Sequence, residues 1–134
     1  MRKLILGITL AAAVAAPVAL AASSAKFWQN HARTAVCGKR TPSDFFQLLC
    51  SAKGIPRPKG GGQGGDPFVA LGRTGKAKLV LLSQDEFPAG NPKTLGNGTT
   101  WSMDGVSCTV AGKVTCKNTV GHGFTIGNGK YKSF

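Results

Sequence analysis

The sequence predicts a mainly β fold, a small disulfide-supported antiparallel β domain of the meander or barrel-like kind. Three observations lead to this prediction. Short runs of alternating apolar and polar residues recur in the C-terminal half, glycines are frequent between them, and four cysteines accompany a chain of only 134 residues. One short helix is expected near the N-terminal end of this domain.

The first 21 residues have the pattern of a secretory signal peptide. Arg2-Lys3 supplies positive charge, an apolar stretch covers residues 4–20, and Ala19-Leu20-Ala21 places small residues where a signal peptidase cleaves. We therefore expect a cleavable signal helix over residues 1–21, with cleavage after Ala21 and Ala22 as the near alternative.

An uncleaved membrane anchor is the competing interpretation of this segment. Its many alanines and Pro17 make it a poor stable span. The sequence therefore predicts a single exported domain over residues 22–134, periplasmic or extracellular, without stable membrane insertion after cleavage.

The N-terminal part of this domain gives the weakest strand signals. Residues 22–35 show no clear periodicity and predict a loosely held arm. Thr41-Pro42-Ser43-Asp44 has the features of a helix start: a capping hydroxyl, a proline at the first helical position and an acid near the positive end of the helix dipole. The apolar residues within 45–49 supply one face, so a short helix is expected over about 41–53.

The middle of the chain predicts a loop followed by strands. Residues 56–66 form a glycine-rich stretch with few side chains to pack, which is typical of a flexible loop. A phosphate cradle needs a preceding strand and a following helix, and this stretch has neither. Strands are expected at 68–71 and 76–82, joined by a turn at 72–75.

The cysteine-bearing segment after residue 99 predicts a meander. Asp104-Gly105 is a two-residue hairpin signal between strands 99–103 and 106–110. A three-residue loop at 111–113 then pairs Cys108 with Cys116, whereas a two-residue loop puts Cys116 out of register. This register predicts a Cys108–Cys116 disulfide, which leaves Cys37 and Cys50 for each other. The expected core face consists of Trp101, Met103, Val106, Cys108, Val110, Val114 and Cys116.

The charge balance is strongly basic. The chain has 17 Lys and Arg residues against five Asp and Glu, a net charge of +12, and loss of the signal peptide with Arg2 and Lys3 leaves +10. Such a charge favours contact with polyanions. The basic residues are scattered and carry no nucleic-acid motif, so nucleic acid is not the expected physiological partner. The candidate contacts are Lys39, Arg40, Arg57, Lys59, Arg73, Lys76 and Lys78.

No catalytic or metal-binding set is apparent. Gly121-His122-Gly123-Phe124 places a histidine between two glycines, which suits a general base, but no obvious partner accompanies it. A turn histidine that bonds the backbone is the favoured interpretation. A zinc site using His31 or His122 lacks closely spaced ligand pairs. We expect no metal and no cofactor.

The C-terminal segment resembles the signature of a family of small secreted bacterial proteins of unknown function. The residues that carry the resemblance are Gly105-Val106-Ser107-Cys108, Gly112 to Asn118, Gly121-His122-Gly123-Phe124, Tyr131 and Phe134. They follow the order G-x-x-C…G-V-T-C-x-N-x-x-G-H-G-F…Y-x-x-F, except that Lys113 stands between Gly112 and Val114. The resemblance implies an exported all-β domain and no particular activity. It also implies a strand leading to Cys50, in conflict with the helix expected there.

Three functions follow as hypotheses. The first is non-enzymatic binding of an envelope or extracellular polyanion, and the second is an inhibitor or effector that binds another protein. The third, ranked lowest, is a small hydrolase that uses His122. Salt separates the first two, because polyanion binding weakens steeply with salt.

Overall fold

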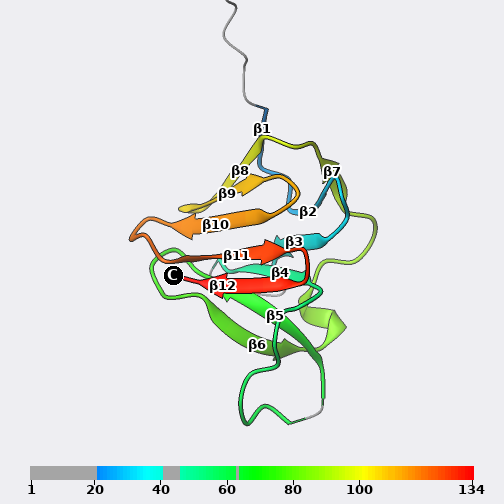
Figure 1. Ribbon diagram of the computed structural model, residues 1–134, viewed down its shortest axis with the longest axis vertical. Coiled ribbons are helices and arrows are strands. Elements are labelled where there is room, and N and C mark those ends of the chain that lie inside the picture. The colour runs from blue at the N-terminus through cyan, green and yellow to red at the C-terminus, as the bar shows by residue number, and fades with distance from the viewer. Residues whose placement is uncertain (1–20, 41–45, 63) are drawn as a thin grey trace, which may run out of the picture.

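The chain folds into short β-strands that form two sheets (Figure 1). The computed structural model describes residues 21–40, 46–62 and 64–134, so the predicted signal segment 1–20 and the expected helix start at 41–45 lie outside it. A 3₁₀ turn, η1 (Gln84–Glu86), accompanies the strands. The strands are β1 (Ala22–Ser23), β2 (Phe27–Asn30), β3 (Ala35–Lys39), β4 (Leu48–Ala52), β5 (Asp66–Leu71), β6 (Lys78–Leu82), β7 (Lys93–Leu95), β8 (Thr99–Met103), β9 (Val106–Val110), β10 (Val114–Asn118), β11 (Gly123–Gly127) and β12 (Lys130–Ser133).

The two sheets lie face to face around one core, which confirms the predicted mainly β, disulfide-supported fold. Sheet A has the order β1-β8-β9-β10-β11-β12, and sheet B has the order β6-β5-β4-β3-β2-β7. Trp28 of sheet B and Trp101 of sheet A are fully buried, with ring centroids 5.7 Å apart. Because strand side chains alternate between faces, every second residue of the central strands β9 and β10 enters this core.

The two sheets repeat one plan. In sheet B, Trp28 lies opposite Cys37, which lies opposite Cys50. In sheet A, Trp101 lies opposite Cys108, which lies opposite Cys116. Each half of the chain therefore builds the same cross-strand row of one tryptophan and two cysteines.

Each half also lends its first strand to the other half. β1 precedes β2 in the chain but pairs in parallel with β8, and β7 precedes β8 but pairs in parallel with β2. The exchange is reinforced in the core, where the Trp101 indole nitrogen donates a 2.7 Å hydrogen bond to the carbonyl of Ala25. The two sheets are thus tied together by exchanged edge strands as well as by packing.

Both predicted disulfides are present. Cys37 is bonded to Cys50 across β3 and β4, and Cys108 is bonded to Cys116 across β9 and β10. The three-residue loop at 111–113 has the expected register, with Val110 opposite Val114. The strands predicted at 68–71 and 76–82 correspond to β5 and β6.

Two predictions for the N-terminal half were wrong. Residues 48–52, expected to continue a helix, form strand β4, because Cys50 pairs with Cys37 and the strand is hydrogen-bonded on both sides. Residues 22–35, expected to be a loose arm, contain β1 and β2 and place Trp28 in the core. In both places tertiary pairing overrides the local sequence preference.

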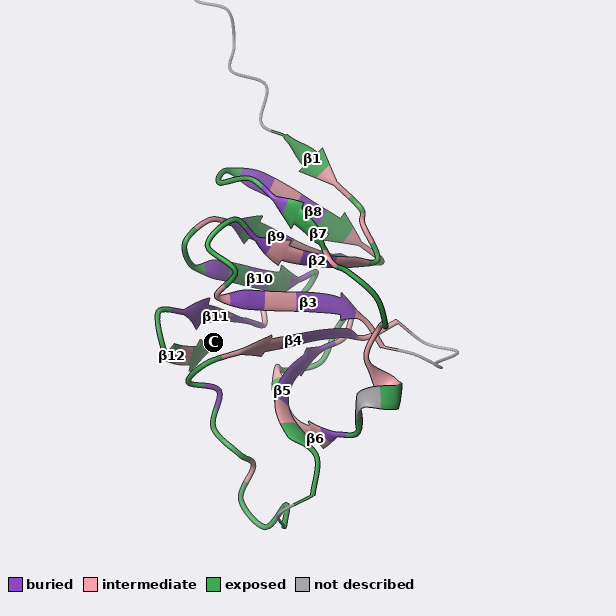
Figure 2. Cartoon of the chain, turned by 90° about the vertical axis from the view of Figure 1, so that its right-hand side faces the viewer, coloured by how far each residue is buried: buried purple, intermediate pink, exposed green. Residues whose placement is uncertain are grey.

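The outer faces of the two sheets differ. A second apolar cluster covers the outer face of sheet B, where the Phe87 ring lies 5.0 Å from Phe68 and 5.3 Å from Phe27. The outer face of sheet A has no such cover in the described residues. Figure 2 shows the result along β10, where buried and exposed residues alternate strictly.

Candidate binding face

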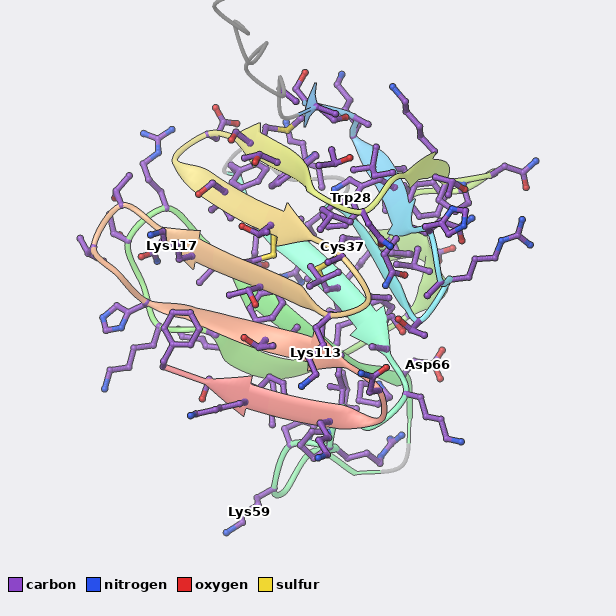
Figure 3. All side chains as sticks on the ribbon, turned by 45° about the horizontal axis from the view of Figure 1, so that its top comes forward. Trp28, Cys37, Lys59, Asp66, Lys113 and Lys117 are labelled. Atoms are coloured by element: carbon purple, nitrogen blue, oxygen red, sulfur yellow. A yellow bond between two sulfur atoms is a disulfide. The ribbon has the colours of Figure 1, made fainter. Side chains whose placement is uncertain are left out.

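The basic residues predicted to contact a polyanion do not share one surface. Arg40 is ion-paired with Glu86 and donates a 2.7 Å hydrogen bond to Gln47. Arg57 donates hydrogen bonds to three carbonyls of the glycine-rich loop, within residues 62–65, and so organises that loop. Lys59 lies on the same loop, well away from sheet A (Figure 3).

Lys39 and Arg73 are the two predicted contacts that the structure brings together. They line a cavity of about 590 Å³ at the end of the molecule where the β5–β6 turn faces the β8–β9 turn. Asp104 also lines it, and the Arg73 side chain donates a hydrogen bond to the backbone carbonyl of Asp104. The cavity therefore mixes both charge signs. Lys76 and Lys78 are exposed beside the same turn.

Asn118 organises the turns around this cavity. Its buried amide nitrogen donates to the carbonyls of Gly72 and Gly75, at 3.1 and 2.7 Å. Its amide oxygen accepts from the backbone N–H groups of Val120 and His122. One side chain thus joins the β5–β6 turn to the β10–β11 turn with all of its bonding groups used.

The Gly121-His122-Gly123-Phe124 motif has a structural explanation in the fold. The backbone of His122 is bonded to Asn118 through both its N–H and its carbonyl. A Cβ atom at Gly123 would lie 1.9 Å from the carbonyl oxygen of Cys116, so only glycine fits between β10 and β11. Phe124 is fully buried in the core. These contacts explain Gly123 and Phe124 and fix the backbone of His122 in the turn, and the role of its imidazole stays a prediction.

The outer face of sheet A gathers lysines and hydroxyl side chains from five strands. Register places Thr100, Thr109, Thr115, Thr125 and Lys132 in one cross-strand row. A second row contains Ser102, Ser107, Lys117 and Gly123, and Gly127 pairs with Lys130 at the other end. We call this surface the hydroxyl–lysine face: Thr100, Ser102, Ser107, Thr109, Lys113, Thr115, Lys117, Thr125, Lys130 and Lys132.

The hydroxyl–lysine face has an unbalanced positive charge. Its lysines are all exposed, and none is ion-paired with a carboxylate of the described residues. No Asp or Glu side chain lies on β8 to β12, and Asp104 is in the β8–β9 turn at the end of the sheet. Figure 3 shows Lys113 and Lys117 toward opposite ends of β10. The face is therefore an extended cationic surface with hydrogen-bonding groups between its charges.

Lys113, Lys117, Lys130 and Lys132 are not among the predicted contacts, because spacing along the chain does not show that they share a face. The signal was present in the alternation itself. In Val114-Thr115-Cys116-Lys117 the apolar residues face the core, so Lys117 and its neighbour two places earlier must face outward. The order of the strands, which brings β10 and β12 onto one face, was not predictable locally.

The described residues contain no cluster of three or more His, Cys, Asp or Glu that could hold a metal ion. No helix in the described part of the chain has the length and hydropathy to cross a membrane. Comparison with protein-family models, curated proteins and solved structures finds no match to this chain. The family resemblance of the C-terminal segment stays a prediction.

Proposed function

We propose that this chain is an exported binding protein that recognises a polyanion of the cell envelope or its surroundings, without catalysis. The observation that carries the proposal is the cationic, acid-free outer face of sheet A. Lysines at both ends of β10 and on β12 leave their charge without a partner in the described residues. Such a surface attracts and concentrates an anionic ligand.

The comparison with sheet B supports this proposal. The two sheets share a plan, yet the outer face of sheet B is buried under Phe87 and its neighbours. The outer face of sheet A carries hydroxyl and lysine side chains and has no apolar cluster over it in the described residues. The lysines of this face repel one another at low salt, and a bound anionic ligand removes that repulsion.

Export is the second part of the proposal. It is supported by the signal-peptide pattern of residues 1–21 and by two disulfides, which persist in oxidising compartments. The bridges also suit a binding protein, because they fix the strands that present the charged face. The proposed ligand belongs to the class of polyanions that includes lipopolysaccharide, teichoic acid and acidic glycans.

Binding of residues 22–134 to immobilised heparin, a model polyanion, tests the face. A variant with Lys113, Lys117, Lys130 and Lys132 changed to Gln should lose at least about tenfold in affinity at low salt and show a shallower salt dependence. The control variant removes the same number of charges elsewhere, at Lys59, Lys76, Lys78 and Lys93. It should retain affinity within about threefold, through loss of long-range attraction alone.

Equal losses in the two variants would contradict the proposal, because net charge rather than this face would then carry the binding. A ligand captured with little dependence on salt would favour the inhibitor or effector hypothesis instead. Circular dichroism of both variants should match that of the parent, since all the substituted side chains are exposed.

A further inference from the structure

We propose that the polyanion is an acidic polysaccharide, and that one chain of it lies along β11 with a sugar ring against Phe134. This inference rests on the proposed function and names the ligand class. Its experiment is designed so that it can fail while polyanion binding stands.

β11 has the smallest outward side chains of the hydroxyl–lysine face. Its outward residues are Gly123, Thr125 and Gly127, and both glycines are held free of side chains by packing. A Cβ at Gly123 would meet the Cys116 carbonyl at 1.9 Å, and one at Gly127 would meet the Gly112 carbonyl at 3.0 Å. Longer side chains on β10 and β12 therefore stand on both sides of β11.

The charges on both sides of β11 run along its length. Lys132 lies opposite Thr125, and Lys130 lies opposite Gly127. On the other side, Lys117 lies opposite Gly123 and Lys113 directly precedes Val114, the partner of Ile126. Lys113 and Lys117 are roughly 13 Å apart along the strand, and β10 and β12 are roughly 10 Å apart. An extended ligand with repeated anionic groups matches this layout better than a compact anion.

Phe134 provides a fixed apolar surface at one end of β11. Its backbone forms two hydrogen bonds with Gly123, each 3.0 Å, and its ring tip lies 2.8 Å from the place of a Gly123 Cβ. The side chain is nevertheless 49% exposed. A ring held against a glycine offers a preorganised surface for the C–H groups of a sugar, at little cost in side-chain entropy.

The other side chains of the face favour a sugar over a nucleic acid. Threonine and serine hydroxyls both donate and accept hydrogen bonds, as sugar hydroxyls do. The Thr115 and Thr125 hydroxyls form a 3.0 Å hydrogen bond with each other in the middle of the face, which leaves one donor and further acceptor sites for a ligand, and Thr125 lies opposite Lys132. Single-stranded nucleic acids are typically bound by several stacking aromatic residues and by arginine, whereas the strands β8 to β12 present no arginine and Phe134 follows them as a lone exposed ring.

The test compares three polyanions with residues 22–134 at two salt concentrations: polygalacturonate, inorganic polyphosphate and single-stranded DNA, at matched charge. Polygalacturonate should bind most tightly at moderate salt, and neutral dextran should bind weakly. Phe134→Ala should weaken polygalacturonate binding about three- to tenfold and leave polyphosphate binding within about twofold. Phe134→Tyr should restore it.

Val120→Ala is the matched control, because Val120 is 57% exposed but lies in the β10–β11 turn. It should leave all three affinities unchanged. Thr125→Glu, which places an acid in the middle of β11, should weaken every polyanion at least about tenfold. Thermal unfolding confirms that each variant is folded.

Equal binding of polyphosphate and polygalacturonate, with no effect of Phe134→Ala, would overturn the sugar assignment and leave the proposed function standing. Undiminished binding in Thr125→Glu would overturn the placement along β11. Failure of all three polyanions to bind would overturn the proposed function as well.

Discussion

At the scale of single residues, two buried asparagines connect the turns at the two ends of the paired sheets. Asn30 donates to the carbonyl of Ala111 at 3.0 Å and accepts from the N–H groups of Thr34 and Ala35, so it joins the β2–β3 turn to the β9–β10 turn. Asn118 does the same at the other end. A buried amide of this kind stabilises only while all of its partners are in place, since an unpaired buried polar group costs free energy.

Asn118→Ala should therefore destabilise the protein by about 2–3 kcal/mol, because it leaves the Gly72 and Gly75 carbonyls without their donor. His122→Ala is the control. The His122 bonds to Asn118 use backbone groups, so this variant should lose less than about 1 kcal/mol. Urea unfolding followed by tryptophan fluorescence measures both. A larger loss in His122→Ala than in Asn118→Ala would contradict this account of the motif.

At the scale of elements, each sheet has its disulfide at the same place in the cross-strand row. A chain-entropy argument gives about 3 kcal/mol for Cys37–Cys50 and about 2.5 kcal/mol for Cys108–Cys116, from their sequence separations of 13 and 8. Paired Cys→Ala variants should lose stability by those amounts in urea unfolding. A loss confined to one bridge would show that the two sheets are not equally dependent on their bridges.

Intact-mass measurement tests whether both bridges form in the purified protein. Reduction should raise the mass by about 4 Da, since each bridge takes up two hydrogens. A rise of about 2 Da would mean that one cysteine pair remains reduced, contrary to the structure.

The elements also show what the sequence made predictable. The hairpins from β8 to β10 were predictable to the residue because Asp104-Gly105 marks one turn and the opposed cysteines fix the next register. β4 was not, because its residues follow a strong helix-start pattern and acquire strand geometry only from β3 and β5. β2 carries its own signal, a tryptophan before two cysteines, which is recognisable once Trp101, Cys108 and Cys116 are seen to repeat it. The positive face depends on strand order and was beyond local inference.

At the scale of the whole molecule, neither half is complete. Sheet A takes β1 from the first half and sheet B takes β7 from the second, and each sheet buries one face against the other. Fragments 22–90 and 91–134 should therefore lack a cooperative unfolding transition when alone. Mixed in equal amounts, they should regain the near-ultraviolet circular dichroism of the intact chain. The midpoint of thermal unfolding of the mixture should rise with fragment concentration. Cooperative unfolding of either fragment alone would contradict this prediction.

The exchange of β1 and β7 has a consequence for the order in which the molecule can be completed. A chain that emerges N-terminus first delivers Ala22 long before its partner Thr100, and Phe27–Asn30 long before β7. The early half can close its own disulfide, yet β2 lacks one neighbour until β7 has emerged, and β1 lacks its partner until β8 has emerged. Final closure must therefore await nearly the whole chain, and non-local pairing of this kind slows folding.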